Sequence, residues 1–145
     1  MLDKYDEIFD AYKKYITENS KYGTRVVKYN TNTSSYFPII VCYVSSNTDL
    51  SNETFYDIDY IENYTVTVNI YTKNKIDGSQ TIPAQEIDKE LHLLTATFFR
   101  KLNMQRNTDR PSFNLDVDIL RRTMRFTCKI GNRGNIIRRW NYERL

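Results

Sequence analysis

The sequence predicts an α+β domain, with a mainly antiparallel four- to five-stranded sheet and two helices packed on one face of that sheet. Residues 3–21 and 83–102 carry apolar side chains at helical spacing, whereas residues 63–73 and 123–130 alternate between apolar and polar side chains, as strands do. A strand with one apolar face must bury that face, and two amphipathic helices can cover it. At 145 residues the chain is long enough for one domain whose core needs neither disulfides nor metals.

The first helix is expected over residues 3–21, followed by Gly23, a residue type that commonly ends helices. Asp3, Asp6 and Glu7 lie early in this helix, where negative charge suits the helix dipole. Its apolar residues recur at three- and four-residue spacing and share one stripe, which we expect to face the core. They are Tyr5, Ile8, Phe9, Tyr12, Tyr15 and Ile16.

Three strands are expected next. Residues 24–29 fit a short strand, and residues 36–46 fit a longer one. The middle of the longer strand is apolar on both faces, which suggests that both faces are covered, one of them by a neighbouring subunit. Residues 63–73 alternate cleanly and are rich in β-branched side chains, which suit a pleated surface. Residues 63–73 are therefore expected to form a well-defined strand.

The polar residues 47–59 separate two of these strands. Their many turn-forming residues predict a long loop or a loosely held hairpin. Phe55 and Tyr56 within it either anchor a partner or fold back on the domain, and the sequence leaves both interpretations open.

The second helix is expected over residues 83–102, after a turn at residues 74–81, because Pro83 suits the first turn of a helix. Residues 103–112 are polar and are expected to form a loop. Residues 113–130 then carry the final strand or strand pair. Its last part alternates strictly, so apolar side chains face one side and cationic ones the other.

A single α+β domain is expected over residues 1–130, followed by a basic, aromatic C-terminal tail at residues 131–145. Arginine, tryptophan and tyrosine are the residues enriched in binding hot spots. We expect the tail to dock on a partner or a neighbouring copy, because Ile137 and Trp140 would otherwise be exposed to water. A disordered basic tail is the alternative.

The sequence shows no pattern typical of a catalytic centre or a cofactor. Its four glycines form no phosphate-binding loop, and a single histidine, His92, excludes most histidine-based triads and metal sites. We expect His92 to be a surface residue, and Cys42 and Cys128 to be small buried side chains that form no disulfide. The sequence thus predicts no enzyme, no cofactor and no metal.

One acidic pair leaves an alternative open. Asp116 and Asp118 lie two residues apart on one strand face and could hold a divalent ion, as acids do in nucleases. No third acid or lysine is placed to complete a two-metal site. Salt bridges to Arg121 and Arg122, or a solvated turn, are the simpler interpretation.

Charge and hydropathy exclude other classes. The 21 basic and 18 acidic residues give a net charge of +3, too mild to indicate nucleic-acid binding by itself. Arg121, Arg125 and Lys129 nevertheless share the wet face of one strand, so a small nucleic-acid-binding protein stays an alternative. No apolar run approaches 18 residues and the N-terminus is acidic, so we expect no membrane span and no signal peptide.

Three segments, ENYTVTVNIYTKNK, QEIDKELHLLTATFFRKL and DILRRTMRFTCKI, together resemble the tail terminator, or tail completion, proteins of long-tailed bacteriophages and related neck proteins. The shared order is an extended strand ending in Tyr-x-Lys, an acidic helix ending in an aromatic-Arg pair, a polar loop and an arginine-rich strand. Tyr71 and Lys73 match the first motif, and Phe99 and Arg100 match the second. The resemblance covers roughly residues 63–130.

This resemblance implies a structural virion protein at the head-tail junction, synthesised in the host cytoplasm. It implies a homo-oligomeric ring, usually a hexamer, that caps the tail tube, joins it to the head connector or neck proteins, and lets DNA pass through its lumen. It implies no catalysis. A connector adaptor or a head-completion stopper is the alternative within the same class.

The residues predicted to make subunit or partner contacts lie on the last long strand and in the tail. They are Arg121, Arg125, Arg138, Arg139, Trp140 and Tyr142. Arg121 and Arg125 have a second interpretation, since their positive charge also suits DNA.

Overall fold

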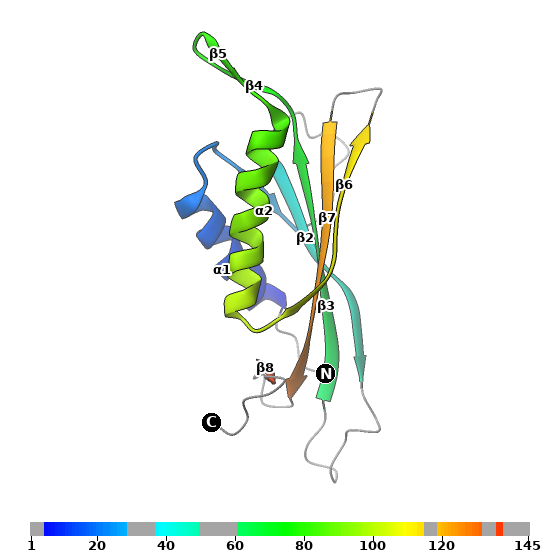
Figure 1. Cartoon of the computed structure of the whole chain (residues 1–145). Coiled ribbons are helices and arrows are strands. Elements are labelled where there is room, and N and C mark those ends of the chain that lie inside the picture. The colour runs from blue at the N-terminus through cyan, green and yellow to red at the C-terminus, as the bar shows by residue number, and fades with distance from the viewer. Residues whose placement is uncertain (1–4, 29–36, 50–60, 115–118, 132–135, 138–145) are drawn as a thin grey trace.

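The computed structural model describes residues 5–28, 37–49, 61–114, 119–131 and 136–137 (Figure 1). In chain order the elements are α1 (Tyr5–Asn19), β1 (Arg25–Val27), β2 (Ile39–Asp49), β3 (Ile61–Thr72), β4 (Lys75–Asp77), β5 (Gln80–Ile82), α2 (Ala84–Lys101), β6 (Gln105–Asn114), β7 (Ile119–Gly131) and β8 (Ile136–Ile137).

Five strands form the main sheet in the order β1-β2-β3-β7-β6, and β8 pairs with the end of β7. β1 runs parallel to β2, whereas the other pairs described in this sheet are antiparallel. β4 and β5 form a separate hairpin that projects beyond the sheet near the start of α2 (Figure 1). The predicted α+β class and mainly antiparallel sheet are confirmed, although the sheet is mixed because of β1.

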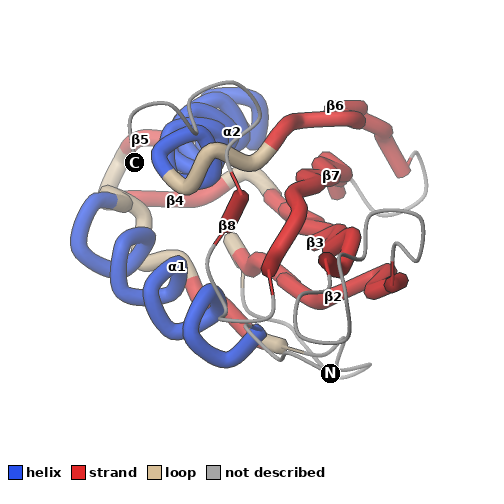
Figure 2. Tube along the Cα trace, turned by 90° about the horizontal axis from the view of Figure 1, so that it is seen from below, coloured by secondary structure: helices blue, strands red, loops and turns tan. Residues whose placement is uncertain are grey.

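Both helices lie on the same face of the sheet, as the sequence predicted (Figure 2). The two-residue alternation of β3 and β7 directs one set of side chains towards them, and these are buried. Val66, Val68, Met124 and Phe126 belong to this set, and each is at most 1% exposed. The hydrophobic core therefore lies between the helices and the central strands.

Aromatic rings fill the space where the helices meet the sheet. Tyr12 of α1 packs against Phe98 and Phe99 of α2, with ring centroids 5.3 and 5.2 Å apart. Phe99 in turn stacks on Phe126 of β7 at 4.4 Å. The buried Tyr12 hydroxyl is 2.6 Å from the Thr95 hydroxyl, so the ring is buried without leaving its polar group unpaired.

The ends of α2 are fixed by local backbone chemistry. Pro83 precedes the helix. The backbone N–H of Ala84, one of the first N–H groups that have no partner within the helix, donates to Asn74 Oδ1 at 2.8 Å. After the helix, Asn103 adopts a φ of 61°, in a region that asparagine tolerates better than most residues. This residue turns the chain from α2 into β6.

β6 is the main difference from the sequence prediction, which was wrong to assign residues 103–112 to a loop. Gln105–Asn114 pair along β7, with a bulge between Arg106 and Thr108. Among the described strands β6 lies at the edge of the sheet. An edge strand can be polar and can include a proline such as Pro111, which has no backbone N–H to donate to a neighbouring strand. Two of its described helix-facing side chains, Arg106 and Asp109, form ion pairs, and therefore no apolar alternation marks this part of the strand.

Smaller differences lie at the ends of other elements. β2 continues to Asp49 and pairs there with β3, which agrees with the hairpin alternative for residues 47–59 over its first three residues. The turn expected at residues 74–81 contains the β4–β5 hairpin around Gly78, whose φ is 64°. Phe55 and Tyr56 lie outside the described residues. The segment expected to be a tail contributes β8, which pairs with β7 next to the start of β6.

Candidate functional site

The face of the main sheet turned away from the helices, here called the open face, is positively charged. Its side chains follow three cross-strand rows: Arg25–Ile39–Tyr71–Arg121–Ser112, Val27–Val41–Asn69–Thr123–Arg110 and Tyr43–Thr67–Arg125–Thr108. Lys129 continues the same side of β7. Among the side chains described on this face there is no Asp or Glu. The described part of this face therefore carries a net positive charge.

A groove of about 770 Å³ lies along β6 and β7 on the open face, and we call it the arginine groove. Exposed arginines and small polar side chains line it: Asn107, Thr108, Arg110, Ser112, Arg121, Thr123 and Arg125. Asp109 also borders the groove, but its carboxylate pairs with Arg122 on the helix side of the sheet. The groove thus offers guanidinium and hydroxyl donors without an accompanying carboxylate.

Arg121 is held in place by its neighbours on β3. Its Nη2 donates to Asn69 Oδ1 at 3.3 Å, and its guanidinium carbon lies 5.7 Å from the centroid of the Tyr71 ring. The Thr123 hydroxyl donates to the same Asn69 oxygen at 2.8 Å. Because Asn69 is only 4% exposed, these contacts fix the position of Arg121 relative to the sheet.

Arg110 and Arg125 are exposed, and neither makes a hydrogen bond or ion pair through its side chain with any residue in the described part of the chain. In the strand register Arg110 faces Thr123, midway between Arg121 and Arg125. Four residues of strand separate Arg121 from Arg125, which corresponds to about 13 Å. Three long cationic side chains therefore border one groove at regular intervals.

A second hollow of about 410 Å³ adjoins the arginine groove through Arg121, which lines both. Its other lining residues include two half-buried aromatic side chains, Tyr43 and Tyr71, together with Val41 and Lys28. The open face therefore changes from arginine-rich over β6 and β7 to aromatic over β2 and β3.

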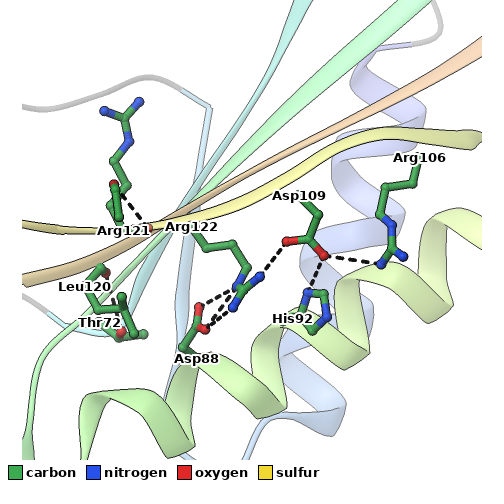
Figure 3. A network of polar contacts seen from close by, with 9 residues as sticks. Thr72, Asp88, His92, Arg106, Asp109, Leu120, Arg121 and Arg122 are labelled. Carbon is green, nitrogen blue, oxygen red and sulfur yellow. Dashed lines mark hydrogen bonds and ion pairs between the residues drawn. The ribbon is translucent and has the colours of Figure 1, made fainter.

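On the opposite side of β7, Arg122 joins α2 to β6 through a network of charged side chains. Figure 3 shows Arg121 and Arg122 pointing to opposite sides of the strand. Arg122 Nε lies 3.1 and 3.0 Å from the two carboxylate oxygens of Asp88, and its Nη2 lies 2.8 Å from one of them. Its Nη1 lies 2.5 Å from Asp109 Oδ1. Burial alone lowers the pKa of Arg122, but the hydrogen bonds to Asp88 and Asp109 outweigh this and raise it.

His92 completes this network, and the expectation that it is a simple surface residue was wrong. Its Nδ1 lies 3.0 Å from Asp109 Oδ2, and its side chain is 21% exposed. Burial lowers the pKa of His92, the charge of Asp109 partly opposes this, and the cations Arg122 and Arg106 lower it further. Despite this short distance, the buried Nδ1 makes no hydrogen bond with the described residues, so the contact with Asp109 is one of charge and proximity.

The two acids of the network, Asp88 and Asp109, already hold a cation, the guanidinium of Arg122. Over the described residues, no group of three or more His, Cys, Asp or Glu side chains is arranged to bind a metal. Cys42 and Cys128 are buried free thiols, and burial raises the pKa of each to about 12, so both stay protonated at neutral pH. No helix in the described ranges is long and apolar enough to cross a membrane.

Of the six predicted contact residues, Arg121 and Arg125 lie together in the arginine groove. The other four, in the tail, lie outside the described residues: Arg138, Arg139, Trp140 and Tyr142. Asp116 and Asp118, the alternative metal pair, also lie outside them.

Sequence reasoning missed Arg110 and Asp109, because both belong to the strand that was expected to be a loop. It also missed the role of Asp88 on α2. The only signal in the sequence was an acidic residue within the apolar stripe of the helix, one position after Ile87.

Neither a comparison with protein-family models nor one with curated proteins finds a match to this chain.

Proposed function

We propose that this protein is a structural virion protein of the head-tail junction of a long-tailed bacteriophage. Its specific role is that of a tail terminator, or tail completion protein, that assembles as a closed ring, caps the tail tube and joins it to the head connector. It acts by contact and geometry, without catalysing a reaction and without a cofactor. A connector adaptor or a head-completion stopper is the alternative at the same junction.

The observation that carries this proposal is the packing of the three segments that resemble tail terminators. They correspond to β3, α2 and β7. β3 pairs with β7 along its whole length, from Ile61 opposite Gly131 to Thr72 opposite Leu120, and α2 packs on both strands. The resembling parts of the sequence thus form one contiguous unit at the centre of the domain, as parts of a shared fold would.

The two edges of the sheet support a ring. On one side β1 pairs with only the first three residues of β2, and on the other side β6 has no described neighbour beyond β7. The edges of β2 and β6 differ from each other, and a head-to-tail ring needs two different surfaces that meet between neighbouring copies. The partners proposed are therefore further copies of the chain, a hexamer by the resemblance, together with the tail tube protein and the head connector.

The mass of the purified chain, measured by size-exclusion chromatography with light scattering, tests this proposal. A ring of about six copies of the 17.3 kDa chain is expected. Purified chain that stays at the mass of one copy, both alone and after incubation with tail tubes, would contradict it.

A shortened chain ending at Ile137 tests the predicted contacts of the tail. It lacks Arg138, Arg139, Trp140 and Tyr142. If these residues join neighbouring copies, the shortened chain has a lower mass than the full chain at the same concentration. The matched control is Lys14→Ala/Arg100→Ala, which changes exposed positions of the two helices and should keep the full mass.

A further inference from the structure

We infer that the arginine groove is a binding site for the phosphate backbone of nucleic acid. Its cationic groups are Arg110, Arg121 and Arg125, on two neighbouring strands of the open face. This site goes beyond a role in ring assembly and can be examined on the chain whether or not a ring forms.

The first argument is charge. The chain as a whole carries only +3, yet the described open face presents cationic side chains without a carboxylate among them. The one acid among the described residues that line the groove is Asp109, and its carboxylate is turned to the helix side and occupied by Arg122. Cations gathered on one face without acids are the electrostatic footprint of a surface that meets a polyanion.

The second argument is the state of the three guanidinium groups. Arg121 is positioned by Asn69 and by the Tyr71 ring, whereas Arg110 and Arg125 have no side-chain partner in the described ranges. A positioned guanidinium flanked by two available ones can contact several phosphates at once. The span of about 13 Å between Arg121 and Arg125 corresponds to about four phosphates of one strand of B-form DNA.

The third argument is the remaining lining of the groove. Thr108 brings a hydroxyl group to the groove, and side chains of this kind donate to phosphate oxygens in many complexes. The hydroxyls of Ser112 and Thr123 already donate to the Arg121 carbonyl and to Asn69. Beside Arg121 the open face continues to Tyr71 and Tyr43, aromatic side chains against which bases of a single strand can pack. This combination favours nucleic acid over an acidic protein segment, which would need no aromatic surface beside the arginines.

The test is fluorescence anisotropy of the full chain with three labelled probes of similar length: a single-stranded oligonucleotide, a duplex and poly-glutamate. Nucleic-acid affinity is expected to fall with rising salt, with a slope of log affinity against log salt of about −2 to −3 for three neutralised phosphates. Whichever form binds more tightly, single strand or duplex, identifies the source of the phosphates.

The decisive variant is Arg110→Ala/Arg125→Ala. Both side chains are exposed, so the variant should keep its circular dichroism spectrum and melting temperature while losing about tenfold or more in nucleic-acid affinity. The salt slope should become shallower by nearly two. The control Lys14→Ala/Arg100→Ala removes the same number of charges from the helices and should leave affinity unchanged.

Three results would overturn the inference: no binding of either nucleic acid at 50 mM salt, an equal loss of affinity in the control variant, or poly-glutamate binding as tight as that of nucleic acid. The last result would assign the groove to an acidic protein instead. A chain that stays monomeric but binds nucleic acid through the arginines would contradict the proposed ring and support the binding site. A ring that binds no nucleic acid would support the ring and contradict the binding site.

Discussion

Asp88 of α2 and Arg122 of β7 form a two-pronged ion pair that ties the second helix to the sheet. The side chains are 5% and 17% exposed, and Arg122 reaches on to Asp109 of the edge strand β6. One guanidinium therefore connects three elements (Figure 3). β6 contributes little apolar surface to the core. The ion pairs of Arg122 with Asp88 and Asp109 are therefore expected to stabilise the position of this edge strand.

Asp88→Ala should destabilise the protein by about 2–3 kcal/mol, because it leaves a mostly buried guanidinium with only one of its two carboxylates. Urea denaturation measures this change in the free energy of unfolding. Asp6→Ala is the control, since Asp6 forms an ion pair of 2.7 Å with Lys28 but is 71% exposed, and its loss should cost less than about 1 kcal/mol. An equal loss of stability in the two variants would show that the buried Asp88–Arg122 pair contributes no more than the exposed Asp6–Lys28 pair.

The protonation of His92 makes stability depend on pH. In the unfolded chain His92 titrates near its ordinary pKa of 6.5, whereas in the folded protein burial lowers its pKa. Between these two values the unfolded chain binds more protons, so acidification favours unfolding. Stability should therefore decrease as pH falls from 7 through 6.5 towards the lowered pKa.

Because His92 is the only histidine, His92→Gln should remove this part of the pH dependence. Denaturation curves of both proteins between pH 5.5 and 7.5 make the comparison. A proton NMR titration of the imidazole ring reports the same quantity directly. A measured pKa at or above 6.5 in the folded protein would contradict the expected direction.

Phe99 is expected to be the most sensitive position of the core. It is fully buried and stacks on Phe126, so Phe99→Ala should cost about 3–5 kcal/mol by leaving a cavity between α2 and β7. Leu93 lies on the same helix at 53% exposure, and Leu93→Ala should change stability by less than about 0.5 kcal/mol. Similar losses for both variants would mean that α2 does not pack on the sheet through Phe99.

The sequence predicted those helices and strands in which apolar residues recur at a regular spacing. The helices and the strands β3 and β7 bury one apolar face each, and the burial imposes a spacing that the sequence displays. On the side that faces the helices, β6 instead has ion-pairing side chains, the exposed Arg106 and the half-buried Asp109, and ion pairs leave no apolar period. A loop was predicted in place of β6 because its polar composition was taken to mean that it has no regular structure.

The candidate site was predicted in part for the same reason. Strict alternation placed Arg121 and Arg125 on the wet face of one strand, where the structure has them. Arg110 completes their groove from the strand that was missed, and Asn69 positions Arg121 from a strand whose polar residues look alike in sequence. Such cross-strand neighbours depend on register, which the sequence of one strand does not reveal.

Negative-stain imaging of the purified full-length chain tests the central claim, a closed ring, most directly. Class averages should show closed rings with a central opening and rotational symmetry, and hexagonal symmetry would match the proposed hexamer. Particles that are single copies, or open filaments with no closed class even in the presence of tail tubes, would contradict the assignment to a ring at the head-tail junction.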